Sequence, residues 1–345
     1  MRFLKYFTNS FIVTAVGLAL AAFVGFYYTP TADAALRAMF LTFILIILEI
    51  SISFDNAVVN AKVLQEMTPK WQHRFLTWGM LIAVFGMRLV FPIMIVSIMA
   101  HINPLSAVNL ALFRPAEYAQ MMLDIHHEVS AFGGVFLLLV SLKYFFDREK
   151  EIHWIRVIES RLVKMGKLES IEIGIALLIL TVFTIYADPT HQLSIIISGI
   201  AGIIVFLGVE AIGVILAHPD GSKGHDIEKI SASLFIYLEV LDASFSFDGV
   251  IGAFAISNNI FIITIGLGVG AMFVRSLTIL MVGEGTLNSF KYLEHGAFYA
   301  IIALALIMIA NTVIHTSEIF TGLIGAVFIG LSIFSSMKDR KIMAD

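Results

Sequence analysis

Apolar stretches of close to twenty residues follow one another along almost the whole chain. A helix of about 20 apolar residues crosses the ~30 Å hydrocarbon core of a bilayer, and a helix satisfies its backbone hydrogen bonds within itself. The pattern therefore predicts an all-α, polytopic transmembrane helical bundle. We expect ten spans, at residues 10–28, 36–61, 75–100, 128–146, 171–187, 192–217, 230–256, 260–283, 294–312 and 317–336.

The composition agrees with a membrane protein. Hydrophobic residues make up 59% of the chain and charged residues 14%, whereas a soluble domain averages roughly 45–50% and about 25%. The net charge of −4 gives no sign of a nucleic-acid partner, so the lipid bilayer is the expected surrounding. The chain has no cysteine, which excludes disulfides, thiolate metal ligands and cysteine nucleophiles. The first stretch lacks an A-x-A-like cleavage site in the right place and runs straight into further spans, so we interpret it as a retained helix.

Basic residues are concentrated in alternate connections, which the positive-inside rule assigns to the cytoplasm. With the N-terminus inside, the outer connections hold only Arg37 and Arg114. The distribution predicts a multi-pass protein of the inner (cytoplasmic) membrane with both termini in the cytoplasm. The longest inner connection, at about 147–170, is either an amphipathic helix on the membrane surface or a plain basic linker. The inner basic residues are Lys62, Lys70, Arg74, Arg148, Lys150, Arg156, Arg161, Lys164, Lys167, Lys223, Lys229, Lys291 and the final KDRK.

Two polar segments interrupt the apolar pattern, "LEISISFDNAVVN" at 48–60 and "LEVLDASFSFDGVIGAFAIS" from residue 238. When Asp55 is aligned with Asp248, Glu49 falls opposite Asp242 and a Ser-x-Ser-Phe-Asp pattern is shared. The next span of each half contains one arginine, and the span after that begins with Glu-x-x-Ala-Phe. These further landmarks are Arg88 and Arg275, then Glu128 and Glu294.

Three landmarks in the same order predict a duplication of five helices plus five. The first repeat covers 1–187, including the inner linker, and the second covers 188–345. The two acidic helices are the second and seventh spans, an odd number of crossings apart, so we expect them to run antiparallel. Such inverted repeats are common in secondary transporters, whose substrate sites lie at the repeat interface near the membrane midplane.

Acidic residues in or near the spans outnumber the arginines available to neutralise them. A charge at the bilayer centre costs roughly 2.5–3.5 kcal/mol, so the unpaired acids must be protonated, hydrated or neutralised by a cation. This surplus predicts a cation pathway. The structural alternative for Asp55 and Asp248 is a buried, hydrogen-bonded pair that stabilises the fold. The acids are Glu49, Asp55, Glu128, Glu210, Glu239, Asp242, Asp248 and Glu294, against Arg88 and Arg275.

Helical spacing divides these polar residues into stripes. At ~100° per residue, Glu49, Ser53, Asn56 and Asn60 share one stripe, and Asp55 lies on another about 120° away. Carboxylate, amide and hydroxyl oxygens suit hard divalent cations such as Mg²⁺ or Mn²⁺. Asp-Asn and Asp-Gly pairs favour turns, so broken helices are expected in both segments. We predict that a transported divalent cation is bound by Glu49, Asp55, Asn56, Glu239, Asp242 and Asp248.

The remaining charged residues have two readings each. Arg88 and Arg275 are expected to be structural counter-ions, or else gating charges. Glu128 and Glu294 lie near helix starts, where a carboxylate stabilises the helix dipole, or they belong to the pathway. Glu210 has no repeat mate and fits a packing role, and the adjacent His126 and His127 fit the membrane interface better than a metal site.

The same residues resemble the TerC family, the tellurium-resistance-associated integral membrane proteins of the wider LysE-type transporter group. The resemblance is carried by "LEISISFDNAVV", the arginine in "GMRLVF" and "DASFSFDGVIGAFAIS", and it covers about 45–310. It implies a metal-ion exporter, with Mn²⁺ as the expected ion. It assigns ligands in both halves, at Glu49, Asp55, Asn56, Asp242 and Asp248. The chain departs from the pattern at Gly249, which stands opposite Asn56, and at the additional Glu239.

The leading hypothesis is a secondary transporter that exports a divalent, Mn²⁺-like cation through a carboxylate site at the repeat interface. The alternative is a non-transporting membrane scaffold of a tellurite or metal stress-resistance complex. An enzyme is not expected, because the sequence has neither a G-x-x-x-x-G-K-[ST] phosphate loop nor an H-E-x-x-H motif. No permanently bound cofactor is expected, and the sequence identifies no protein partner.

Overall fold

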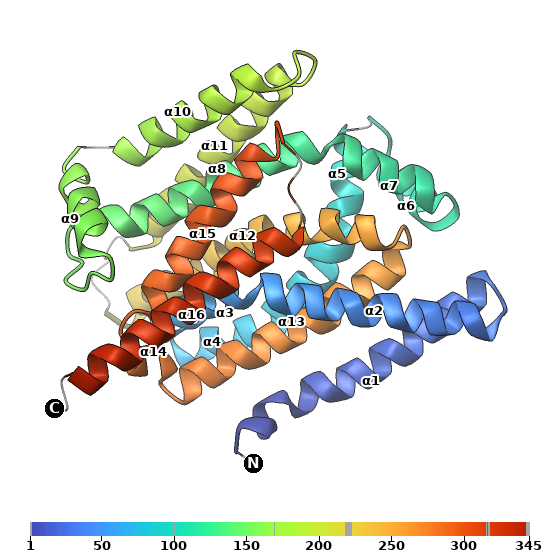
Figure 1. Ribbon diagram of the computed structural model, residues 1–345, viewed down its shortest axis with the longest axis horizontal. Helices are drawn as coiled ribbons and strands as arrows, with labels where there is room; N and C mark the ends of the chain where they lie inside the picture. The colour runs from blue at the N-terminus through green and yellow to red at the C-terminus, as the bar shows by residue number, and fades with distance from the viewer. Residues whose placement is uncertain are drawn as a thin grey trace.

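The computed structural model is a bundle of helices, and the part of the chain that it describes contains no β-strand (Figure 1). The helices α1 and α10 lie at opposite edges of the bundle, with α8, α12 and α15 between them. The described residues are 2–99, 101–168, 170–217, 223–314, 316 and 318–342.

The helix bounds follow the apolar pattern closely. The expected span 75–100 is divided into short successive pieces that include two π-helical stretches, η1 and η2. In chain order the elements are α1 (Arg2–Tyr28), α2 (Ala32–Ile52), α3 (Phe54–Gln65), α4 (Pro69–Arg74), η1 (Phe75–Gly79), η2 (Ile82–Val90), α5 (Phe91–Met99), α6 (Pro104–Phe113), α7 (Pro115–Asp124), α8 (His126–Phe146), α9 (Arg156–Met165), α10 (Ile171–Tyr186), α11 (Gln192–Ala217), α12 (Lys223–Ile256), α13 (Ile260–Gly283), α14 (Thr286–Ser289), α15 (Leu293–Ala310) and α16 (Glu318–Ile342).

Eight helices within the described residues are long and apolar enough to cross a membrane, which confirms a multi-pass membrane protein. Two of the ten expected spans are not among them. Residues 171–187 form α10, whose 16 residues fall short of a full crossing. Residues 230–256 belong to α12, and this stretch carries three acids. The eight are Leu4–Tyr28, Ala32–Ile52, Pro69–Ile98, His126–Phe146, Gln192–Ile215, Ile260–Gly283, Leu293–Ala310 and Phe320–Arg340.

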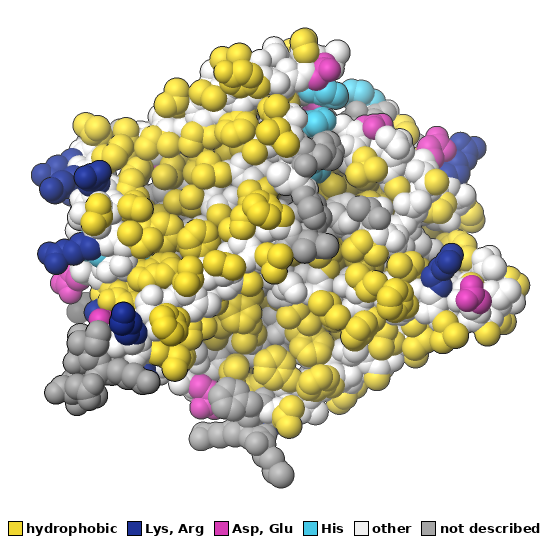
Figure 2. All heavy atoms as spheres, in the orientation of Figure 1, with side chains coloured by type: hydrophobic (Ala, Val, Ile, Leu, Met, Phe, Trp, Pro, Cys, Tyr) yellow, Lys and Arg dark blue, Asp and Glu magenta, His cyan; other side chains and the backbone are white. Residues whose placement is uncertain are grey.

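The surface of the bundle matches a lipid environment. Apolar side chains cover most of the face in Figure 2, and Lys and Arg lie at its edges. The helix α8 is the most enclosed of the eight, with 83% of its apolar window buried, whereas α1 has 17%. The centre of the fold is therefore α8, packed against α11 and α15, and α1 presents most of its surface outward.

The predicted helix break is present in the first acidic segment and absent from the second. The helix α2 ends at Ile52, Ser53 has φ −95° and ψ 18°, and α3 begins at Phe54. In α12 the helix runs unbroken through residues 247–249. The prediction of a second break was wrong because a glycine inside a helix costs only about 0.5–1 kcal/mol relative to alanine, and packing of α12 against α8, α11 and η2 outweighs it.

The linker at about 147–170 is helical where its charge pattern is amphipathic. Residues 156–165 form α9, which packs against α8. The plain-linker alternative is therefore wrong for this part of the segment.

The two acidic segments run antiparallel, as the sequence predicts. The Asn56 amide donates to Asp242 Oδ1 at 2.9 Å. Beyond the end of α3, the backbone amide of Thr68, the N-cap of α4, donates to Ser231 Oγ at 3.0 Å. Residue numbers therefore rise along one segment as they fall along the other. The contact brings the two acidic segments together.

A polar cavity between the two acidic segments

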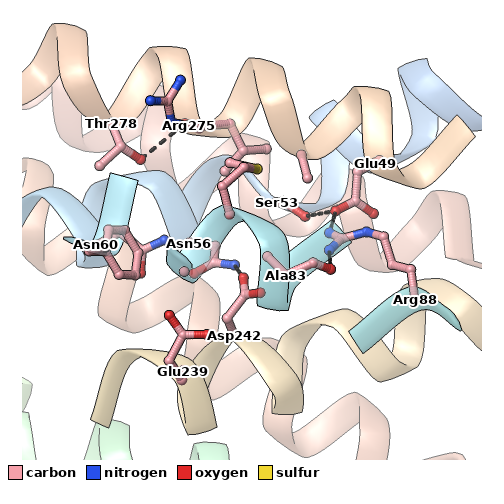
Figure 3. A pocket seen from close by; sticks show the side chains of 15 residues that line it. Glu49, Ser53, Asn56, Asn60, Ala83, Arg88, Glu239, Asp242, Arg275 and Thr278 are labelled. Atoms are coloured by element: carbon pink, nitrogen blue, oxygen red, sulfur yellow. Dashed lines mark hydrogen bonds and ion pairs between the residues drawn. The ribbon is translucent and has the colours of Figure 1, made fainter. Parts of the chain in front are cut away.

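A cavity of about 40 Å³ lies where the two acidic segments meet (Figure 3). We call it the polar cavity. Its walls come from α2 and α3, from the η1–η2 region, from α12 and from α13. This volume exceeds the ~10–15 Å³ that one water needs, so it has room for an ion that keeps little of its hydration. The polar side chains that line it are Glu49, Ser53, Asn56, Asn60, Arg88, Glu239, Asp242, Arg275 and Thr278.

One wall is the stripe predicted from helical spacing. Glu49, Ser53, Asn56 and Asn60 all line the cavity, although the helix is interrupted among them. The interruption does not rotate the stripe because the i to i−4 bonds continue across it. The Ser53 amide donates to the Glu49 carbonyl at 2.9 Å, and the Ala57 amide donates to the Ser53 carbonyl at 3.2 Å.

A buried ion pair closes one end of this wall. The Arg88 guanidinium donates to Glu49 Oε1 and to the carbonyl of Ala83, and both charged side chains are 3% exposed. Ser53 Oγ donates to the same carboxylate oxygen at 3.1 Å. Removing either partner of a buried pair leaves an uncompensated charge, which costs about 3–5 kcal/mol. Arg88 thus has the geometry of a structural counter-ion.

The opposite wall holds acids with too few hydrogen-bond donors. Asp242 Oδ1 accepts from Asn56, but Asp242 Oδ2 and both carboxylate oxygens of Glu239 have no donor among the described residues. Glu239 is 8% exposed. Burying an ionised carboxylate without a partner is strongly unfavourable. These three oxygens therefore form an acceptor set suited to a positively charged species.

Close backbone approach makes room for these acids. A Cβ placed on Gly79 of η1 would lie 2.5 Å from Glu239 Oε1, and a Cβ on Gly270 of α13 would lie 2.5 Å from the Glu49 side chain. π-Helical turns are rare and frequently mark functional sites. Here they lie in the span that presents both Gly79 and Arg88 to the cavity.

Arg275 lines the cavity without pairing with its acids. Its Nε donates to the Leu76 carbonyl at 2.8 Å, and among the described side chains it forms no ion pair. Figure 3 shows its guanidinium turned away from Asp242 and Glu239. The two arginines, which the sequence treats as equivalent, therefore have different surroundings.

One predicted ligand, Asp55, does not line the cavity. Asp55 is buried, with 4% exposure, and its Oδ1 has no hydrogen-bond partner among the described residues. It follows the second stripe and points away from the stripe that lines the cavity. The backbone of Asp248 is helical within α12, but its side chain lies outside the described part of the chain.

The other charged residues also lie away from the cavity. Glu128 is in the first turn of α8, where it accepts from Ser194 Oγ at 2.6 Å. Glu294 is in the first turn of α15 and pairs with Lys62 at 3.4 Å. Glu210 pairs with Lys143. These positions favour the helix-start and packing readings.

Within the described residues, no group of three or more His, Asp or Glu side chains is placed to hold a metal ion. The polar cavity instead combines two acids that have oxygens without a donor, Glu239 and Asp242, with amide and hydroxyl oxygens. Mg²⁺ and similar cations that keep part of their water are bound through only one or two carboxylates. This donor set therefore fits a transiently bound, partly hydrated ion.

Sequence reasoning did not identify several contributors to the cavity. Gly79, Thr278 and the Leu76 and Ala83 carbonyls carry no sequence signal that links them to a site. Asn60 did carry one, because it falls on the same stripe as Glu49 and Asn56.

The sequence model of the family described as "Protein of unknown function (DUF475)" matches residues 54–342. The chain belongs to this family. The matched range includes Asn56, Arg88, Glu239, Asp242 and Arg275, so the DUF475 pattern spans most of the polar cavity. No curated protein and no solved structure matches the chain. The DUF475 family assigns no activity, and the functional argument rests on the cavity.

Proposed function

We propose that this DUF475 protein is a secondary transporter that carries a divalent metal cation across the membrane through the polar cavity. The observation that carries the proposal is the set of three carboxylate oxygens, on Glu239 and Asp242, that have no donor among the described residues. An acid within a bilayer is costly unless it is neutralised, and hard cations prefer oxygen ligands. A cation that visits the cavity satisfies both conditions.

The arrangement of the helices supports the same proposal. The antiparallel contact of α3 with α12 is what an inverted repeat of 1–187 and 188–345 requires. In transporters of that plan the substrate site lies at the repeat interface. Both halves of the chain contribute to the polar cavity. Glu49 and Asn56 come from the first half, and Glu239 and Asp242 come from the second.

The resemblance to the TerC family adds the ion and the direction to the proposal. It points to Mn²⁺ and to export from the cytoplasm across the inner membrane. The chain carries no phosphate-binding loop motif, so ion gradients are the proposed source of energy.

Metal accumulation in cells tests the proposal. Cells expressing the wild type should hold less Mn²⁺ than cells without it, as measured by mass spectrometry of washed cells. Asp242→Asn and Glu239→Gln should each lower export about tenfold or more. Contacts with charged groups contribute about 1.5–3 kcal/mol, and ~1.4 kcal/mol is a factor of ten.

Glu294→Gln is the matched control, because Glu294 has the same charge but pairs with Lys62 outside the cavity. It should export like the wild type. If both cavity variants reach the membrane and export like the wild type, the carboxylate pathway is wrong. A wild type that changes the level of no metal would instead favour the scaffold hypothesis.

A further inference from the structure

We propose that Arg275 is a tethered counter-cation that competes with the transported cation for Asp242 and Glu239. The inference rests on the proposed function and assigns a regulatory role at the same site. When no ion is bound, the guanidinium turns into the cavity and pairs with these carboxylates. In the other arrangement Arg275 is held at the Leu76 carbonyl, its position in the structure, and the two carboxylates are open to the cation.

The charge balance of the cavity is the first argument. Its described lining holds three carboxylates, on Glu49, Glu239 and Asp242, and two guanidinium groups, on Arg88 and Arg275. The net charge of these groups is 2 − 3 = −1. A divalent cation added beside both arginines gives +1, whereas the same cation with Arg275 withdrawn gives zero. Electroneutral binding of a divalent cation thus requires Arg275 to move away.

The second argument is the loose attachment of Arg275. A single hydrogen bond from its Nε holds it to the Leu76 carbonyl at 2.8 Å, and it is only half-buried. Its guanidinium has further donors that no described carboxylate accepts. Across the cavity, three carboxylate oxygens of Glu239 and Asp242 lack a donor. The two unpaired sets are complementary, and rotation of a long side chain is enough to join them.

The third argument is the ion pair already present in the other half. The internal alignment sets Glu49 opposite Asp242, and each half has one arginine in the following span. Glu49 and Arg88 are joined, so an Arg275–Asp242 pair is the corresponding contact in the second half.

One sequence difference between the halves explains why only one pair is formed. Asn56 donates to Asp242 at 2.9 Å and so takes over part of the role of Arg275. Its counterpart is Gly249, whose Cβ position would lie 3.4 Å from Glu49 Oε2. A glycine offers no side-chain donor there, and Glu49 keeps Arg88. With Asn56 as a donor, Asp242 does not need Arg275 and can bind an ion. The difference between Asn56 and Gly249 therefore explains why only Glu49 keeps its arginine.

The experiment compares wild type and Arg275→Gln as purified, detergent-solubilised full chains. Mn²⁺ binding is measured by isothermal titration calorimetry, with Arg114→Gln, an exposed arginine paired with Glu117, as the matched control. Arg275→Gln should bind Mn²⁺ about tenfold or more tightly than wild type. The substitution removes the ion pair that the cation must displace, and a tenfold change in affinity corresponds to ~1.4 kcal/mol. Unchanged or weaker Mn²⁺ binding in a folded Arg275→Gln protein would overturn this inference but would leave the proposed function standing.

A cation-free measurement tests the pairing itself. Melting temperatures of wild type, Arg275→Gln, Asp242→Asn and the double variant in chelator form a double-mutant cycle. A pair gives non-additive shifts, with the double variant closer to wild type than the sum predicts. Additive shifts would overturn the inference. A wild type that binds no cation in the calorimeter would overturn the proposed function and, with it, the competition.

Discussion

At the scale of single residues, the cavity depends on glycine positions as well as on polar side chains. Gly79 allows Glu239 Oε1 to lie 2.5 Å from where a Cβ would be. Real Cβ atoms do not approach an oxygen so closely. The carboxylate is the free end of a flexible side chain, so an added methyl group would displace it without disturbing the backbone. Gly79 is thus a position where the site can be altered while the fold is kept.

We predict that Gly79→Ala lowers Mn²⁺ export about tenfold while the protein still folds. The methyl group would push the Glu239 carboxylate out of its place, and displacements near ~1 Å can cost up to about a hundredfold in a positioned site. Export from cells and the melting temperature of the purified protein measure the two effects separately.

Gly208→Ala, on α11, is the matched control, since a Cβ there meets nothing within 4 Å. It should export normally and be equally or more stable, because alanine is favoured over glycine in helices by about 0.5–1 kcal/mol. Normal export by a folded Gly79→Ala protein would show that the position of Glu239 does not matter for transport.

Helical periodicity located one part of the cavity at this scale. The spacing of Glu49, Ser53, Asn56 and Asn60 predicted one wall, because the interruption at Ser53 preserves the helical bonds. The same periodicity separated Asp55 from that wall, yet Asp55 was still predicted as a ligand on its charge and its place in the motif. Gly79 was not foreseeable, because its role depends on the packing of two helices far apart in sequence.

At the scale of the elements, turn preference predicted a helix break in each Ser-Phe-Asp segment, and the structure has one in the first segment, at Ser53. Asp-Gly in α12 did not end the helix, since local preference is weak against tertiary packing. The π-helical turns η1 and η2 were not foreseeable either. Their extra residues leave no mark in an apolar stretch, and they alter which side chains face the cavity.

The linker helix α9 is attached through one fully buried carboxylate. Glu159 is 0% exposed, and its Oε1 accepts from the Trp154 and Ile155 amides at 3.2 and 3.0 Å. Lys150 Nζ lies 3.3 Å from its Oε2. Burial alone would raise the pKa of Glu159, but the Ile155 amide, His295 and Lys150 outweigh it and hold that pKa below its usual range. Burial lowers the pKa of Lys150.

We predict that Glu159→Gln loosens the linker at neutral pH. Loss of a charged, buried acceptor costs about 1–3 kcal/mol, so amide hydrogen exchange over 147–170 should accelerate roughly ten- to a hundredfold. Acid below about pH 4.3, the ordinary glutamate pKa, should act in the same direction on the wild type. The pKa of Glu159 is lower folded than unfolded, so its stabilisation is complete above about pH 4.3, the ordinary glutamate value, and is lost as the pH falls further.

Glu151→Gln is the matched control for the linker, because Glu151 is exposed in the same segment. Hydrogen–deuterium exchange, corrected for the intrinsic pH dependence of exchange, gives the comparison. Equal exchange in Glu159→Gln and Glu151→Gln would show that the buried network does not hold α9.

At the scale of the whole molecule, the charge of the connections predicts how the bundle is oriented in the membrane. The helix α8 separates two connections of very different charge. The connection before it, 101–125, has a single basic residue, Arg114. The connection after it contains Arg148, Lys150, Arg156, Arg161, Lys164 and Lys167. This asymmetry across one helix is the strongest positive-inside signal in the chain.

We predict that Ala116→Cys reacts with a membrane-impermeant maleimide on intact cells and that Glu149→Cys reacts only after permeabilisation. Both positions are exposed, and the native chain has no cysteine, so each variant reports a single site. The reason is the positive-inside rule. In the expected orientation one basic side chain lies on the outer face, whereas the reverse orientation would place six there. Labelling in the reverse order would invert the bundle and make the proposed direction of transport an import. Labelling of both sites from outside would remove α8 from the membrane-spanning set, and with it the arrangement that places the cavity within the bilayer.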